Sequence, residues 1–206
     1  MAEITVARAL SEIKLLDKRI QKETGNTVFV TYQKGKDNPK GFKDVNEAHS
    51  EISASLQKIK DLIARRNKIK SGIVQSNAIT KVKISGKEYT VAEAIERKTS
   101  IAYEINLLNV LKRQFQSVSQ QVDRANEDVE RRLDAQLEQL YGSDRKNTDT
   151  QGVIDVFKSQ NEVKLVDPIG LEKLIKSIEE EIDDFESEVD LALSESNALT
   201  VFEIED

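Results

Sequence analysis

The chain has 206 residues, of which 38% are hydrophobic and 33% are charged, and its formal net charge at pH 7 is −6. The apolar fraction lies below the ~45–50% of ordinary globular chains, which disfavours a compact globule and favours helices that bury one narrow face. The absence of cysteine excludes disulfides and thiolate zinc sites, and no run reaches the ~18 uncharged apolar residues of a membrane span.

The first predicted elements are a helix, a strand and a basic loop. Thr5 can cap a helix that runs to about Thr24, with Gly25 as its stop. Residues 27–32, TVFVTY, are β-prone and predict a strand. The following QKGKDNPKGFK is rich in glycine, proline and lysine, which predicts a loop.

A second helix is predicted to start at Asp44 and to end at Asn77. Asp44 and Glu47 have the spacing of a capping box, in which each side chain bonds a backbone amide near the other residue. Asn tolerates the left-handed conformation that ends many helices, so Asn77 is the expected stop. Beyond it, two β-prone runs flank Ser85-Gly86-Lys87 and predict a hairpin over about 80–90.

The longest predicted helix starts at a second capping box, Thr90 to Glu93, and runs to about Tyr141, with Gly142 as its stop. At ~1.5 Å per residue it is about 75 Å long, so it needs partners along its length. Its apolar residues recur at threes and fours, as in a coiled coil. They are Ile101, Ile105, Leu108, Phe115, Val118, Val122, Val129, Leu133, Leu137 and Leu140.

The remaining chain predicts a polar segment, an acidic helix and a final strand. Residues 143–166 are poorly periodic, with one short helical turn around Val153–Phe157. Asp167-Pro168 supplies an N-cap followed by a proline at the first helical position, and the helix it starts runs to about Ser196. Residues 199–204 are β-prone and predict a C-terminal strand.

Two helix ends in this chain have nearly the same sequence. SNAITKVKI begins at Ser76, and SNALTVFEI begins at Ser196. We expect the two exits to lie side by side and to feed one small sheet shared with the hairpin; the alternative is chance combined with ordinary cap chemistry. Residues 1–100 carry a net charge of +8 and residues 101–206 carry −14. We therefore expect the acidic last helix to neutralise basic residues 58–70 of the second helix.

The sequence offers little for catalysis. His49 is the only histidine, which excludes most metal triads and leaves one place for a histidine-dependent nucleophile. It lacks a nucleophile motif nearby, and a solvated surface histidine is the simpler interpretation. The acidic residues 179–184 diverge around a helix and are better explained as a solvated face than as a cation site. No catalytic residue, metal site or cofactor is therefore predicted, and the protein is expected not to be an enzyme.

Two basic regions remain as candidate binding sites. The loop with Lys34, Lys36, Lys40 and Lys43 also holds two glycines, a combination that can wrap phosphates. The second region is the junction at the two helix exits, where cations, amides and hydroxyls suit a phosphate-and-ribose ligand. Its predicted ligand-binding residues are Arg65, Arg66, Asn77, Thr80, Lys81, Lys83, Arg97, Lys98, Asn197 and Thr200. The alternative is that these cations only pair with the acidic helix.

The stretch from Asn67 to Leu108 resembles uncharacterised helical proteins of large tailed bacteriophages. The resemblance rests on a helix ending in Asn, a short hairpin and then T-[VL]-x-E-A-[IL]-x-R-[KR], here TVAEAIERK. A similar pattern occurs in bacterial proteins labelled septicolysin-like. The matching positions are Asn77, Thr90, Glu93, Arg97, Asn197 and Thr200. The resemblance covers about half of the chain and supplies no catalytic residue, and the pore-forming label suits this highly charged chain badly.

Together these patterns predict a mainly α, single elongated domain over 1–206, with long antiparallel helices or a coiled coil and a small β-sheet at one end. We expect a homo-oligomer, because the longest seam needs a cover of comparable length. The first functional hypothesis is a phage accessory protein in the cytoplasm of the infected host, which sequesters a nucleotide-type defence signal. The second is a virion structural or assembly protein. Nucleic-acid binding ranks last, because aromatic residues are only 5% of the chain and no helix is basic throughout.

Overall fold

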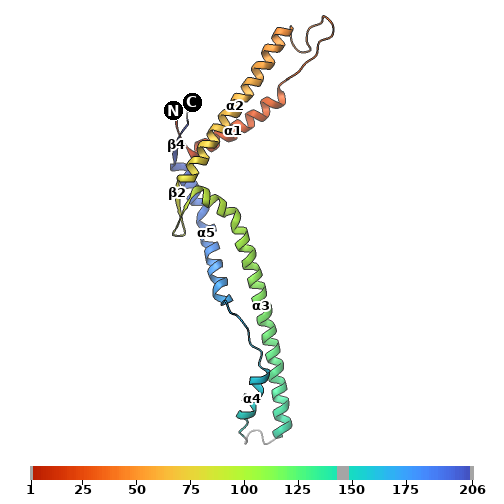
Figure 1. Ribbon diagram of the computed structural model, residues 1–206, viewed down its shortest axis with the longest axis vertical. Coiled ribbons are helices and arrows are strands. Elements are labelled where there is room, and N and C mark those ends of the chain that lie inside the picture. Colours follow the sequence, from red (N-terminus) through yellow and green to blue (C-terminus); the bar gives the residue numbers. More distant parts are fainter. Residues whose placement is uncertain (1, 143–148, 205–206) are drawn as a thin grey trace. The chain divides into compact units, whose positions relative to one another are not determined.

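The computed structural model describes residues 2–142 and 149–204, and within them it forms five helices and four short strands (Figure 1). The protein is mainly α-helical, as predicted. Its internal contacts divide the chain into two units. Unit 1 comprises Met1–Thr99 together with Asp184–Asp206, and unit 2 comprises Ser100–Asp183.

Unit 1 is built around two helices that pack side by side, α1 (Val6–Asn26) and α2 (Val45–Ile79) (Figure 1). One apolar cluster joins the start of α1 to the end of α2, and Ala9 and Ile69 at its centre are completely buried. Ile13, Ile73 and Ile204 complete the contact. As their spacing predicts, the apolar residues of each helix therefore form one stripe that is buried against the other helix.

The β-structure consists of two separate two-stranded sheets, which corrects the expectation of a single sheet fed by both helix exits. The predicted hairpin is confirmed as β2 (Lys81–Ile84) and β3 (Lys87–Thr90). The C-terminal strand β4 (Val201–Ile204) pairs instead with an unpredicted strand, β1 (Ala2–Thr5). Both pairs are antiparallel, and the two exits are joined by packing, since α2 contacts β4.

The two sheets are variants of one arrangement. In each, a helix ends in Ser-Asn-Ala-x-Thr and passes into a strand, whose partner strand ends at Thr-Val-Ala and starts another helix. Val91 N–H donates to the carbonyl of Thr80 at 2.8 Å, and Val6 N–H donates to the carbonyl of Thr200 at 3.0 Å. Each exit therefore satisfies an amide that the first turn of the next helix would leave without a partner.

Three predicted helix boundaries are wrong in an informative way. Asn77 does not end α2, because Thr80 continues the helical pattern by donating to Ser76 O at 2.9 Å, and the backbone then becomes extended. The helix α5 (Leu171–Leu199) likewise passes the predicted end at Ser196 and ends at Leu199, with Thr200 N–H donating to Ser196 O at 2.8 Å. The helix starts at Leu171 and not directly after Asp167. The Asp167 carboxylate accepts hydrogen bonds from the amides of Gly170 and Leu171, which closes a tight turn before the helix.

Smaller boundary differences concern α1 and the segment after α3 (Val91–Tyr141). Helix α1 continues through Gly25 to Asn26. The predicted stop of α3 is confirmed, since Gly142 follows it with φ 49°. The predicted turn at 153–157 belongs to a longer helix, α4 (Gln151–Asn161), while residues 143–148 of that polar segment lie outside the described residues.

The predicted strand at 27–32 is also wrong. The segment belongs to no sheet, although it follows α1 with an extended backbone at Thr27. High β-propensity measures how well a residue fits beside neighbouring strands, and the two sheets of this fold are formed elsewhere.

Unit 2 contains the greater part of α3, all of α4 and the first turns of α5. Among the predicted seam residues of α3, Ile101, Leu108, Val129, Leu133 and Leu137 are buried. An extended linker between α4 and α5 is anchored to α3 by Asn126, whose side chain exchanges two hydrogen bonds of 2.8 Å with the backbone of Val163.

Candidate functional site

The predicted ligand-binding residues fall into two groups. Thr80, Lys81 and Lys83 lie at the exit of α2 and on β2, and Arg97 and Lys98 lie in the second turn of α3. Asn77, Asn197 and Thr200 lie in the last turns of α2 and α5 or directly after them. Arg65 and Arg66 stand apart, because 14–15 helical residues separate them from Thr80, which is roughly 20 Å along α2 at ~1.5 Å per residue.

Arg65 and Arg66 are engaged with α1. Arg65 Nε lies 3.1 Å from a carboxylate oxygen of Glu12, and Arg66 Nε lies 2.8 Å from one of Asp17. Lys58 of the same helix pairs with Glu23 at 2.8 Å. The carboxylates opposite these basic residues of α2 thus come from α1, which corrects the expectation that the acidic last helix neutralises them.

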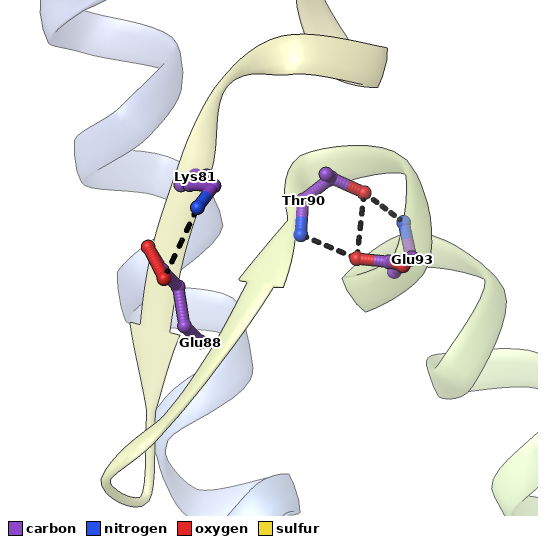
Figure 2. A network of polar contacts seen from close by, with 4 residues as sticks. All are labelled: Lys81, Glu88, Thr90 and Glu93. Atoms are coloured by element: carbon purple, nitrogen blue, oxygen red, sulfur yellow. Dashed lines mark hydrogen bonds and ion pairs between the residues drawn. The ribbon is translucent and has the colours of Figure 1, made fainter.

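The acidic residues of α5 meet lysines of α3 instead. Asp190 forms an ion pair with Lys98 in unit 1, and Glu179 forms one with Lys112 in unit 2. Near the hairpin, the side chain of Lys81 lies 3.2 Å from Glu88 across the two strands (Figure 2). Lys81 and Lys98 of the predicted site therefore already have carboxylate partners. Because these pairs are largely exposed, each is worth only ~0–1 kcal/mol, and an anionic ligand could compete for them.

Arg97 occupies the aromatic part of the junction. Its guanidinium carbon lies 5.0 Å from the ring centre of Phe185, in the geometry of a cation–π contact. The same ring meets Tyr89 of the hairpin edge-on, with ring centres 5.9 Å apart. A cation, two aromatic rings and the hairpin thus converge at one place, where α5 packs against β3 and the start of α3.

The start of α3 is fixed by the predicted capping box, which Figure 2 shows. Thr90 N–H and Oγ1 donate to Glu93 at 2.7 and 2.9 Å, and Glu93 N–H donates back to Thr90 Oγ1 at 3.1 Å. The Thr90 amide, followed by its hydroxyl, lowers the pKa of the Glu93 carboxyl below its ordinary value of 4.5. Thr90 and Glu93, two residues of the motif that resembles phage proteins, therefore have a structural role at the start of α3.

The hairpin turn is also held by α5. Ser85 and Gly86 both have positive φ, 49° and 76°, as a tight two-residue turn that matches the twist of the strands requires. Ser85 N–H donates to the carboxylate of Glu188. Glu188, for which the sequence predicts no role, thus anchors the turn, because the fold brings its carboxylate within reach.

A second candidate site lies in the loop between α1 and α2, far along both helices from the sheets (Figure 1). Two cavities of about 310 and 320 Å³ border the extended segment 27–33 and share Ile52 of α2 as a wall. The larger is lined mainly by apolar side chains, among them Phe29, Val45 and Ala48, and also by His49. The lone histidine is exposed, as the simpler interpretation expected, but it borders an apolar cavity.

The loop has a defined backbone. Two turns close it, with Asp37 N–H donating to Lys34 O and Phe42 N–H donating to Pro39 O, each at 3.0 Å. Gly35 and Gly41 supply the positive φ that these turns require. The predicted phosphate-wrapping glycines therefore serve the shape of the loop.

A third candidate surface runs along α3 in unit 2. Beside the buried seam, Tyr103, Leu107, Val110 and Val118 recur at spacings of four, three and eight residues, which places them on one neighbouring stripe of the helix. Tyr103 is 80% exposed, Leu107 50% and Val118 44%. We call this set the second seam. Val118 was expected in the buried seam, and it lies instead on this exposed stripe.

In the described residues no helix is sufficiently long and apolar to cross a membrane. Across the same ranges, no group of three or more His, Cys, Asp or Glu side chains is arranged to hold a metal ion.

Comparison with known proteins adds no relative: no family model, curated protein or solved structure matches this chain. The resemblance to phage proteins therefore stays a prediction, and function must be argued from the chain itself.

Proposed function

We propose that the protein is a non-enzymatic assembly protein that self-associates through the second seam of α3. The observation that carries the proposal is the second seam, in which Tyr103, Leu107 and Val118 are exposed and Val110 is half-buried, beside a seam that the chain already covers. A helix with two adjacent apolar stripes suits a bundle of three or more helices, and unit 2 leaves the second of these stripes largely exposed. A second copy supplies the missing neighbour.

The linker of unit 2 supports the same conclusion. Its apolar side chains are exposed, with Val166 at 87% and Ile169 at 61%. The second seam and these linker residues are both exposed apolar surface on a unit that has few fully buried residues. Burial of such a surface contributes ~25 cal/mol per Å², so association would stabilise the unit substantially.

The test is the molecular mass in solution. Sedimentation equilibrium of the wild type is expected to give a dimer or larger oligomer. Leu107→Glu is expected to weaken association at least about tenfold, since a charge buried in an apolar seam costs more than ~1.4 kcal/mol. Asn109→Glu, on the opposite face of the same helix, is the matched control and should leave the mass unchanged. A monomeric wild type would contradict the proposal.

The phage resemblance suggests where such a protein would act. A virion structural or assembly protein should be detected by mass spectrometry in purified particles. Presence only in lysate from early infection would instead favour a free accessory protein in the host cytoplasm.

A second candidate function is binding of a nucleotide-type signal at the junction, and the cluster of Arg97, Phe185 and Tyr89 favours it. The guanidinium of Arg97 suits a phosphate group and the half-buried ring of Tyr89 suits a base, while the ring of Phe185 is buried and contacts both. Calorimetry against cyclic nucleotides and ADP-ribose derivatives should show binding that Arg97→Ala abolishes and Arg131→Ala in unit 2 preserves. No heat of binding across this panel would remove the candidate.

A further inference from the structure

The loop segment 27–33 has the side-chain pattern of a strand without belonging to a sheet. Exposure rises and falls along it: Thr27 and Thr31 are partly buried and Phe29 is 41% exposed, whereas Val28, Val30 and Tyr32 are exposed by 54%, 81% and 66%. An alternation of period two is the pattern of an extended chain with two faces. The face turned to solvent here is the apolar one, the reverse of an ordinary surface strand.

The backbone of this segment is positioned at its two ends. Thr27 Oγ1 donates to Glu23 O at 2.6 Å, and Thr31 Oγ1 donates to Lys40 O at 2.8 Å. Lys40 N–H donates to Tyr32 O at 3.1 Å. Among the residues that the structure describes, no strand lies against Val28, Phe29 or Val30. An extended edge of this kind is a template for another strand.

The surroundings of the segment are positively charged. The loop carries Lys34, Lys36, Lys40 and Lys43 against two carboxylates, Asp37 and Asp44. Lys40 Nζ lies 5.6 Å from the ring centre of Tyr32, so one cation stands directly at the apolar face. Such a field attracts acidic partners and repels basic ones.

We propose that segment 27–33 is a docking edge for an extended, acidic segment of a partner protein, which binds by adding a strand. Main-chain hydrogen bonds to residues 28–30 would supply affinity. Aliphatic side chains of the partner would cover Val28, Val30 and Tyr32 or enter the cavities of about 310 and 320 Å³ beside them, and its carboxylates would meet the lysines. This surface belongs to unit 1 and is independent of the second seam.

Two other occupants fit the surface less well. A second copy would have to offer an acidic β-prone strand, and the strand of that kind in this chain, β4, is already paired with β1. A nucleic acid would find lysines but few stacking surfaces, since two of the four exposed large apolar residues from Val28 to Tyr32 are valines. The apolar edge favours a peptide.

The experiment is selection from a display library of random 12-residue peptides on the wild-type protein, with counter-selection on Val30→Glu. Val30 is almost fully exposed, so this substitution should not unfold the chain. Selected peptides are expected to alternate aliphatic and acidic residues. In fluorescence anisotropy, the best peptide should bind Val30→Glu at least about tenfold more weakly than the wild type, and a central proline in the peptide should abolish binding.

Two further variants make the result decisive. Lys34→Glu with Lys36→Glu should weaken binding of acidic peptides at least about tenfold, while Val156→Glu, at an exposed valine of α4 in unit 2, should leave peptide binding unchanged. The proposal is overturned if no peptide is enriched over Val30→Glu, if the enriched peptides are basic, or if the proline variant binds as well as its parent. A change in oligomeric mass caused by Val30→Glu would also overturn it, because the occupant would then be a second copy.

Discussion

The hairpin β2–β3 and the sheet β1–β4 perform the same structural task with different means. In both, one strand follows the end of a helix and its partner strand leads into the start of another helix. Matching hydrogen bonds join the two, from Val91 N–H to Thr80 O and from Val6 N–H to Thr200 O. The hairpin strands are joined by two residues, whereas β1 and β4 lie about 200 residues apart in sequence. The feature that the two junctions share is therefore the backbone hydrogen bond between the end of one helix and the start of another, and not the turn.

The side chains of the two junctions differ in a complementary manner. Gly72 of α2 stands against Phe202 of β4, and the residues at the corresponding positions of the other junction are Ala192 of α5 and Val82 of β2. At the helix starts, Thr90 and Glu93 form a full capping box, whereas the corresponding pair is Thr5 and Arg8. At each of these positions, a substitution can place the residue of one junction at the corresponding position of the other.

The largest effect is expected from removing the buried isoleucine of each sheet. Ile84 is 1% exposed and Ile204 is 3% exposed, so replacement of either by alanine should cost ~2–4 kcal/mol of unfolding free energy. The kinetic effects should differ, because the hairpin closes a short loop and the terminal sheet a long one. Ile84→Ala should mainly slow folding, and Ile204→Ala should mainly accelerate unfolding.

Stopped-flow chevron plots of the two variants measure this difference. Equal φ-values at the two positions would contradict the idea that the local junction forms first. The comparison is meaningful only if both variants lose more than ~0.6 kcal/mol at equilibrium.

The next effect concerns Gly72. A Cβ at this position would lie 2.4 Å from Phe202 Cε2, so Gly72→Ala requires the ring to move. We expect a net loss of ~1–2 kcal/mol after the ~1 kcal/mol that alanine gains over glycine in a helix. Adding Phe202→Val reproduces the pair found at the other junction and should recover most of the loss. Urea unfolding measures both variants.

Gly25 provides the control for this cycle. It lies in α1 with no atom within 4 Å of an added Cβ, so Gly25→Ala should be neutral or slightly stabilising. If Gly72→Ala and Phe202→Val proved additive, the contact between these two positions would have no energetic role in the junction.

Local sequence chemistry predicted the parts of this fold that short-range interactions determine. The capping boxes at Asp44 and Thr90, the hairpin and Gly142 all follow from residues within a few positions of each other. Strand β1 escaped prediction because its four residues acquire a strand partner only from the other end of the sequence. A signal was present, since Thr5-Val6-Ala7 repeats Thr90-Val91-Ala92, but only the structure shows that the repeat matters.

The sequence predicts where the basic residues of the candidate junction site lie, but not all of the side chains that they contact. The sequence places Lys81, Arg97 and Lys98 near one junction, and the structure agrees. The alternative interpretation, in which these cations pair with the acidic helix, holds for Lys98 and Asp190, whereas the sequence does not indicate that Glu88 would meet Lys81, because that pair depends on strand pairing. For segment 27–32 the local preference for a strand is clear, but the prediction is wrong because no strand of the described residues lies beside it.

A smaller effect is expected at the helix starts. Thr90→Ala should cost ~1 kcal/mol or somewhat more, since it removes both the cap and the anchor of Glu93, and Thr5→Ala should cost less. Arg8→Glu should complete a capping box at α1 and place a negative charge in its first turn, which favours the helix by a few tenths of a kcal/mol. Thermal unfolding by circular dichroism ranks these variants, and a destabilised Arg8→Glu would show that Arg8 has another role.

The smallest effect is the pH dependence that distinguishes the two capping sites. Because the hydrogen bonds from Thr90 lower the pKa of Glu93, the folded state binds a proton at this carboxyl less readily than the unfolded state does. The stabilisation is therefore fully present above the ordinary pKa of 4.5 and is lost as the pH falls through the lower folded-state value. The difference in unfolding free energy between the wild type and Glu93→Gln should accordingly shrink from pH 6 to pH 3, which urea titrations at several pH values would measure. Arg8→Ala, at the corresponding position of α1, should show no such change, because the Thr5–Arg8 pair that caps this helix contains no carboxyl group. A constant difference for Glu93→Gln would mean that the neutral amide or acid caps α3 as well as the carboxylate does, and the two helix starts would then be electrostatically equivalent.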